Sequence, residues 1–371
     1  MSIIYHSAEP EARQTKYLEH NNLDFILNVG PGRSLMRNSV RLNANIKITD
    51  DGTQLPTGTV YLDYKLGAHA VIENIQVSFT GGVSPGLREN ISNYARWVNM
   101  LTTATHSEDD YNNGLMACEL RSPNENCSSI IAQGTVSTTT TPVTDLMDFS
   151  MKPQCILNTM QGDHLPYEKT GDIRLTFNLA RNMSALMGAA QGPAATYEIS
   201  SPHVSYQSSP TVGDPMKSVT SMRTVYNVKQ AILSGTSNIS VQVPGVSDAC
   251  SISFQRQDLE NVNVFNNYDL AMVQGIRDVQ FLFNDSTNKY VTYQQSDLNT
   301  MIKNYVDSFN DTGHTQMYLD TFRNNKGFGL GQGFAGFVDL SRQRFALQMV
   351  SDITNIHPYN CYMYFHMVLD M

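Results

Sequence analysis

The second half of this chain repeats a segment of its first half. Residues 71–79 read VIENIQVSF and residues 275–283 read GIRDVQFLF, so Ile, Gln and Phe recur at matching positions. The match continues without a gap into the next element, where Ser92 aligns with Ser296 and Trp97 with Met301. A strand, a loop and an amphipathic helix therefore occur twice, about half a chain apart. An internal repeat on this scale constrains the whole fold.

Three shorter pairs support the duplication and keep the same order in both halves. They are Met36-Arg37 with Met222-Arg223, each ahead of an apolar run, residues 148–150 with 339–341, and residues 165–167 with 357–359. Any one of these pairs is expected by chance, but four in one order favour a true duplication. The offset between the halves shrinks after the helix, which predicts an extra loop at that point in the first half.

Composition excludes several classes of protein. Hydrophobic residues make up 41% of the 371 residues and charged residues only 16%, which is typical of a β-rich folded chain with polar loops and not of a disordered one. The formal net charge is −9 and no cluster of Lys and Arg occurs. Because a nucleic-acid binder usually carries a basic surface, we expect no direct sequence-specific binding of nucleic acid.

No targeting segment is visible. No stretch is long and apolar enough to span a bilayer, and residues 1–20 are polar with mixed charge, unlike a signal or transit peptide. We therefore expect the chain to fold in the cytosol or to be delivered by a route other than cleavable secretion. The five cysteines are scattered and none has metal-ligand spacing, so we expect reduced thiols; they are Cys118, Cys127, Cys155, Cys250 and Cys361.

Short alternating strands separated by turn signals dominate the chain. Apolar residues at spacings of three and four predict one helix over residues 90–101 and its counterpart over 296–309. Residues 362–369 are apolar on both faces, which predicts a central strand. Many strands with about one helix per half predict an all-β fold of two tandem β-sandwiches with short helices.

The expected boundaries follow from composition. Residues 1–20 form an arm, weakly helical over 9–18, and residues 21–188 form the first sandwich. Residues 189–196, rich in Ala, Gly and Pro, form a linker, and residues 197–371 form the second sandwich. A long stretch without periodicity, residues 106–145, is predicted to be a surface loop of the first sandwich.

Few residues point to chemistry. Glu108, Asp109 and Asp110, next to His106, are weak candidates for a calcium site, but no second histidine completes a metal site, so we expect no metal. The glycines of residues 327–334 lack the Lys-Ser/Thr of a phosphate loop and favour a close backbone approach. No catalytic motif is present, and we expect no cofactor and no enzyme activity.

Aromatic residues on the predicted helices have two interpretations. Tyr94, Trp97 and Tyr305 fall at helical spacing, which favours packing on the sheets over a sugar-binding platform.

Residues 71–101, the matching residues 275–305 and the ending 334–369 together resemble a double jelly-roll major capsid protein of the PRD1–adenovirus lineage, which encloses tailless icosahedral double-stranded DNA viruses. The resemblance is architectural, covers most of the chain and has no diagnostic short motif.

The resemblance implies a fold and a function. The two sandwiches would be jelly rolls, and three chains would form a homotrimer with a pseudo-hexagonal outline that tiles the virion shell. Neighbouring capsomers, penton proteins and minor capsid proteins would be its partners. The resemblance leaves open whether an internal membrane lies beneath the shell. Residues 106–145 would form a tower or inter-protomer loop, and the arm would lie at the inner face or grip a neighbour.

Two other functions stay open. A tandem β-sandwich adhesin or carbohydrate-binding protein, of a phage tail or a cell surface, would be a monomer or an extended fibre with an exposed aromatic patch. A glycoside hydrolase or lyase would need a cleft with paired carboxylates, and no pair stands out in the sequence.

Overall fold

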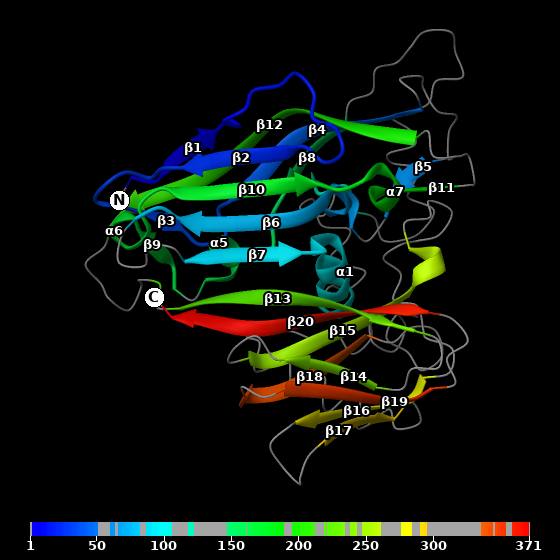
Figure 1. Ribbon diagram of the computed structural model, residues 1–371. Coiled ribbons are helices and arrows are strands. Elements are labelled where there is room, and N and C mark those ends of the chain that lie inside the picture. Colours follow the sequence, from blue (N-terminus) through cyan, green and yellow to red (C-terminus); the bar gives the residue numbers. More distant parts are fainter. Residues whose placement is uncertain are drawn as a thin grey trace.

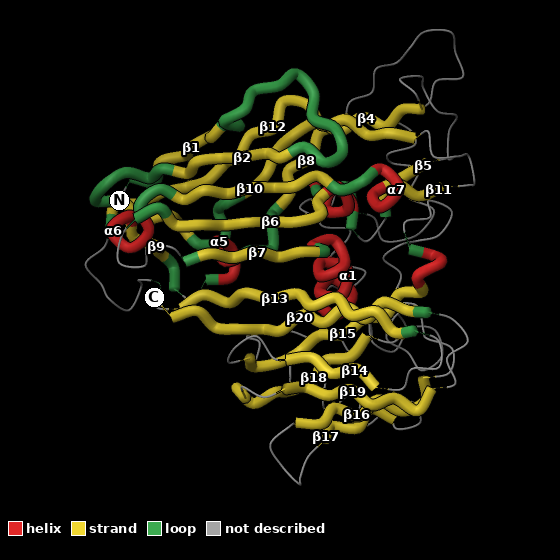
Figure 2. Tube along the Cα trace, viewed as in Figure 1, coloured by secondary structure: helices red, strands yellow, loops and turns green. Residues whose placement is uncertain are grey.

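The chain folds into stacked antiparallel sheets (Figure 1). The computed structural model describes residues 2–50, 60–63, 66–81, 87–105, 118–121, 147–160, 162–188, 195–211, 219, 221–233, 238–242, 247–260, 276–283, 290–294, 335–343, 346–353 and 358–370. Within these ranges every strand pairing is antiparallel, and Figure 2 shows how little of the chain is helical.

The first half forms two large sheets and a two-stranded ribbon. One sheet has the order β8-β4-β12-β3-β9, with β1 paired to β12; its strands are β8 (Met147–Met151), β4 (Arg41–Asp50), β12 (Ala195–Pro210), β3 (Arg33–Met36), β9 (His164–Pro166) and β1 (Ile4–Ala8). The second has the order β2 (Asn22–Leu27), β10 (Ile173–Leu179), β6 (Ile72–Phe79) and β7 (Arg88–Ser92). The ribbon pairs β11 (Leu186–Gly188) with β5 (Val60–Leu62).

The second half forms two four-stranded sheets. One has the order β13 (Ser221–Ile232), β20 (Tyr359–Asp370), β15 (Ser247–Arg256) and β18 (Ala335–Gln343). The other has the order β14 (Asn238–Gln242), β19 (Ala346–Ile353), β16 (Ile276–Phe283) and β17 (Tyr290–Gln294). As the apolar ending predicts, β20 is central and pairs with β13 on one side and β15 on the other.

Both halves share one strand order. We number eight main strands in each half in chain order: β1, β2, β4, β6, β7, β8, β10 and β12 in the first, and β13 to β20 in the second. The series β1-β12-β4-β8 and β13-β20-β15-β18 each place the first, eighth, third and sixth of these strands side by side. The series β2-β10-β6-β7 and β14-β19-β16-β17 each place the second, seventh, fourth and fifth side by side. This order in two facing sheets is a jelly roll. The prediction of two tandem jelly rolls in an all-β chain is confirmed.

The common strand order also tests the four sequence pairs. Residues 71–79 and 275–283 fall on β6 and β16, the fourth strands, and residues 148–150 and 339–341 fall on β8 and β18, the sixth strands, so both pairs are confirmed. The other two are wrong. The Met-Arg pair aligns the segment before β4, a third strand, with β13, a first strand. The Pro-Tyr pair aligns the segment before β10, a seventh strand, with the start of β20, an eighth strand. A match of two or three residues beside a strand recurs by chance, so it cannot align the strands of the two halves.

The helix of the first half begins later than predicted. Residues 88–92 are strand β7, whose side chains alternate between exposed and buried, and α1 spans Tyr94–Thr105. The residue between them, Asn93, has φ 52°, which ends the strand and turns the chain into the helix. The counterpart helix over 296–309 lies outside the described residues. None of the described helices has the combined length and apolarity to cross a bilayer.

The other helical segments among the described residues are short, each of five residues or fewer. They are α5 (Ile156–Thr159), α6 (Tyr167–Thr170), α7 (Asn182–Ala185) and the 3-10 turns η1 (Gly67–Val71) and η3 (Gln257–Leu259).

The N-terminal residues belong to the sheets. Residues 4–8 form β1, which pairs with β12, and Tyr17 is 1% exposed and bridges to Ile199 of β12. Residues 9–18, all described, contain no helix. The expected weak helix is therefore wrong, because local propensity there yields to pairing with β12.

One hydrophobic core fills the first jelly roll and reaches into the second. Its members alternate along β2, β4, β6 and β10, and Tyr362 and Tyr364 of β20 join the same cluster. Tyr94 and Trp97 are at most 4% exposed, as their helical spacing predicts. Tyr305 lies outside the described residues.

Candidate functional site

The two jelly rolls meet at a joint where α1 and β7 face β13 and β20 (Figure 1). Trp97 of α1 packs against two side chains of β20. Its ring centroid is 5.6 Å from that of Tyr364 and 5.0 Å from that of His366, the latter edge-on at 72°. All three side chains are buried. Aromatic pairs in these arrangements add attraction beyond the area that they bury.

Polar contacts cross the same joint. The side-chain amide of Asn93 donates to Asn227 Oδ1 at 2.7 Å, and the Asn93 carbonyl accepts from the Tyr364 hydroxyl at 2.8 Å. The Thr159 hydroxyl of α5 donates to the carbonyl oxygen of Arg223 at 2.6 Å. These contacts fix the register of one jelly roll on the other.

A buried carboxyl group lies within the joint. Glu89 of β7 is 3% exposed, and its two oxygens accept from the Ile156 amide at 2.8 Å and the Thr224 hydroxyl at 2.6 Å. Burial raises the pKa of Glu89 to about 7, although both hydrogen bonds oppose the rise. The charge on this residue therefore changes near neutral pH, at a contact between the two halves.

A cleft of about 370 Å³ opens beside the joint and is lined from both halves. The Arg96 guanidinium lies 4.3 Å from the ring centroid of Tyr362, and Lys229 Nζ lies 5.2 Å from it. Lys229 pairs with Glu260 at 2.8 Å, and Glu260 also accepts from the hydroxyl of Tyr362 and the amide of Asn360. The cleft thus holds several ionised groups in fixed positions.

Contacts with neighbours keep this pair charged. Burial alone would lower the pKa of Lys229, but its bonds to Glu260 and Tyr362 raise it. Burial alone would raise the pKa of Glu260, but its hydrogen bonds with Lys229 and Tyr362 lower it. Glu73 also lines the cleft. Its surface is exposed, but protein atoms surround its carboxyl group closely, and the resulting loss of hydration raises the pKa of Glu73.

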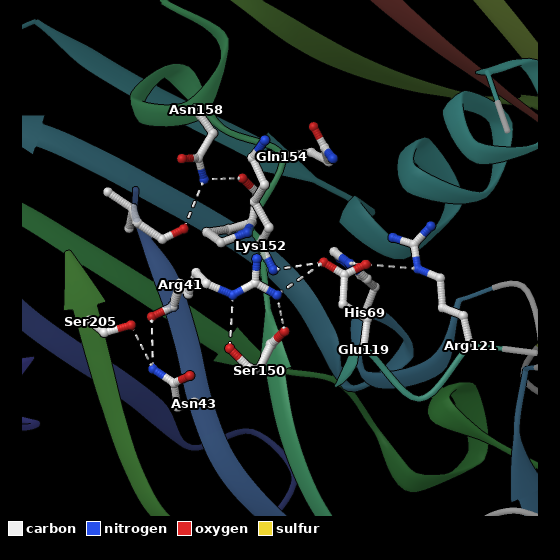
Figure 3. A network of polar contacts seen from close by, with 12 residues as sticks. Arg41, Asn43, His69, Glu119, Arg121, Ser150, Lys152, Gln154, Asn158 and Ser205 are labelled. Carbon is white, nitrogen blue, oxygen red and sulfur yellow. Dashed lines mark hydrogen bonds and ion pairs between the residues drawn. The ribbon is translucent and has the colours of Figure 1, made fainter. Parts of the chain in front are cut away.

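A second polar network, drawn in Figure 3, anchors residues 118–121. The buried Glu119 carboxylate lies 3.2 Å from Arg121 Nε, 3.5 Å from His69 Nε2 and 4.0 Å from Arg41, and it accepts from the Lys152 amide at 2.9 Å. Burial would raise the pKa of Glu119, but His69 and Arg121 hold it at about 2. The carboxylate therefore stays ionised and ties four segments together.

Further contacts complete this anchor. The Ala68 amide donates to the Glu119 carbonyl at 2.9 Å, and His69 Nδ1 lies 2.9 Å from the Tyr94 hydroxyl. Gly67 has φ 52°, and a Cβ at this position would overlap the backbone of Glu119 and Leu120. Residues 118–121 thus lie directly on the turn η1 and fix one point within the predicted loop 106–145.

Most of the predicted site residues are not placed. His106, Glu108, Asp109, Asp110 and the glycines of residues 327–334 lie outside the described residues. In the part of the chain that the structure describes, no three His, Cys, Asp or Glu side chains form a metal-binding group. Cys118, Cys155, Cys250 and Cys361 are free thiols, as predicted, and Cys127 is not described.

Glu89, Glu119 and the cleft were not predicted from the sequence. Many of their partners lie far away along the chain: 135 positions separate Glu89 from Thr224, and 159 separate Arg96 from Gln255. No local spacing signals such contacts. A charged residue at a buried position of the alternating strand β7 is the one available sign, and it becomes visible only once that strand is recognised.

Comparisons with known proteins give structural matches alone. No family model and no curated protein matches the chain. A chain in the cryo-EM structure of the Sputnik virophage matches with a TM-score of 0.61 and 12% identity, covering 99% of this chain and 85% of that one. The Faustovirus major capsid protein has a TM-score of 0.61 and 8% identity, over 99% and 90%. The mavirus major capsid protein has a TM-score of 0.55 and 10% identity, over 99% and 87%.

At sequence identities this low, the structural matches show a shared fold. This chain is similar to those proteins in architecture over nearly its whole length, and the double jelly-roll fold that the sequence resemblance implies is confirmed.

Proposed function

We propose that this protein is a major capsid protein that builds the shell of an icosahedral virion. The observation that carries the proposal is the double jelly roll itself, which matches the Faustovirus and mavirus major capsid proteins over 99% of this chain. Fold alone does not determine function. The contact between the two jelly rolls adds an independent argument, because the same kind of contact can form between the jelly rolls of neighbouring chains.

The joint is a head-to-tail contact. The fifth strand of the first jelly roll, β7, meets the first strand of the second, β13. The equivalent strands β17 and β1 have no such contact with each other within one chain in the described residues. Contacts between unlike surfaces form closed rings when the rotation between units permits it. If β17 of one copy meets β1 of the next, three copies give a ring of six jelly rolls, the pseudo-hexagonal trimer.

The surface of β1 suits such a contact. Among the described strands β1 pairs with β12 alone. Ile3, Ile4 and Tyr5 at this edge are 46%, 42% and 76% exposed. Exposed apolar residues on an edge strand favour pairing with another chain unless something covers them.

Further parts of the proposal follow from the capsid role. We place the boundary between the jelly rolls at residues 211–220, because β12 completes the first sheet and β13 begins the second. Trimers would contact neighbouring capsomers, with penton and minor capsid proteins as further partners in the virion. The protein would act without catalysis, and its net charge of −9 fits a shell that leaves the genome to other components.

Light scattering behind a sizing column tests the proposal. A trimer has three times the chain mass of 41.3 kDa, about 124 kDa. We expect that mass to persist on dilution, and purified trimers to form shells or hexagonal sheets visible by electron microscopy. A stable monomer at high protein concentration, together with binding on a glycan array, would contradict the proposal and indicate the adhesin instead.

A further inference from the structure

One sheet face of the second jelly roll is covered by a helix from the first. Helix α1 contacts alternate residues of β20, the eighth strand of that jelly roll. Trp97 packs on Tyr364 and His366, and the Arg96 guanidinium lies over the ring of Tyr362. Alternate residues of a strand lie on one face of a sheet, so α1 lies on the outward face of β20.

The same face continues onto β15, the third strand, where it is polar and buried. Ser251 and Ser253 pair with the two tyrosines of β20, so they share that face, and both are 0% exposed. Gln255 follows on the same face, is 3% exposed and accepts a hydrogen bond from α1 at 3.4 Å. The third and eighth strands of the second jelly roll thus present a polar face against which a helix packs.

The equivalent face of the first jelly roll is also polar, but it is partly exposed. Val204 and Tyr206 of β12, the eighth strand, point into the core, so His203 and Ser205 lie on the outward face, where both are half-buried. Asn43 of β4, the third strand, pairs with His203 and donates to Ser205 Oγ at 2.9 Å. In a single chain, the face that corresponds to the seat of α1 is therefore partly open to solvent.

Two hollows adjoin on this outward face, and His203 lines both. One has a volume of about 420 Å³ and is lined by polar residues of β4, β8 and β12 and by the exposed Cys118. The other has a volume of about 470 Å³ and reaches Ser7 of β1. Ser7 pairs with Ser205, so the depression formed by the two hollows extends to β1, the edge that would meet the next copy of the chain.

We propose that this depression is the seat for a second copy of the chain: the segment that corresponds to α1 in the neighbour's second jelly roll covers β12 and β4, as α1 itself covers β20 and β15. The inference rests on the proposed trimer and names a surface that such a trimer would bury. In the sequence repeat Met301 takes the place of Trp97, so the second half supplies an apolar side chain for the contact. A contact between unlike surfaces can repeat around a closed ring.

Asn45→Trp tests this contact. Asn45 of β4 is half-buried and lines the hollow of about 420 Å³, so a Trp side chain would fill the hollow without entering the core. Because overpacking destabilises a contact, we expect the trimer dissociation constant, measured by sedimentation over a dilution series, to rise about a hundredfold. Gln76→Trp adds the same ring at an exposed site on the outward face of β6 and should leave the dissociation constant unchanged.

Cys118 provides a second measurement that leaves this face unaltered. Its exposed thiol lines the depression, so alkylation of Cys118, followed by mass spectrometry of its peptide, should be about tenfold slower in wild-type trimers than in monomers obtained by dilution or by Tyr5→Glu. A wild type that is always monomeric would refute the proposed function itself. If the wild type is a trimer, equal alkylation rates, or a folded Asn45→Trp with the wild-type dissociation constant, would overturn this contact alone.

Discussion

At the scale of single residues, two buried glutamates make stability depend on pH in opposite ways. The pKa of Glu119 is lowered to about 2 from an ordinary value of 4.5, so its contribution is present above 4.5 and lost as pH falls through 2. The pKa of Glu89 is raised to about 7, so its contribution is present below 4.5 and lost as pH rises through 7. Glu89 therefore dominates the response near neutral pH.

We predict that Glu89→Gln removes this response. From pH 4.5 to 8 the wild type should lose about 3 kcal/mol of unfolding free energy through Glu89, because each pKa unit corresponds to about 1.4 kcal/mol. Gln keeps the shape and accepts from Ile156 without a charge. The measurement is urea unfolding at both pH values. Glu9→Gln, at an exposed site, should behave as the wild type; a Glu89→Gln curve that retains the full loss would refute the assignment.

Gly67 and Gly32 separate two costs of adding a methyl group. Both have positive φ, but a Cβ on Gly32 meets nothing within 4 Å, whereas one on Gly67 overlaps the backbone of Glu119. We predict that Gly32→Ala costs about 1 kcal/mol, from backbone conformation alone. Gly67→Ala should cost about 3 kcal/mol or more, because the anchor of residues 118–121 must also shift. Chemical denaturation compares them, and equal costs would show that the close approach is unimportant.

At the scale of elements, the exposed edge of β1 is the part that assembly needs. We predict that Tyr5→Glu converts trimers to monomers, because it places a charge on a 76% exposed side chain of an edge that another copy would cover. Leu18→Glu makes the same change at a 49% exposed residue outside β1 and should leave the trimer intact. Both variants should match the wild type in circular dichroism. Light scattering that finds trimers in Tyr5→Glu would rule out this edge as the contact.

Strands with a regular apolar pattern were predictable, and others were not. Apolar positions alternate with polar ones along β4 and β6 and occupy both faces of β20, which is why these strands follow from the sequence. In contrast, β1 has no regular apolar pattern and becomes a strand by pairing with β12. The short strand β7 resembled helix because Ile91 and Tyr94 are three apart. Contacts such as Glu89 with Thr224 depend on packing between the jelly rolls, which no local pattern encodes.

At the scale of the whole molecule, the joint should make two jelly rolls behave as one. The core cluster of the first half includes Tyr362 and Tyr364 of β20, so neither half buries its own apolar surface alone. We therefore predict a single calorimetric transition for the wild type. Trp97→Ala removes the side chain that packs on Tyr364 and His366, at a cost of about 3–5 kcal/mol, and should split the transition in two. Trp97→Phe keeps an aromatic ring there and should retain one transition. Two resolved transitions in the wild type would mean that the rolls fold independently, and the joint would then be too weak to serve as the template for the contact between chains.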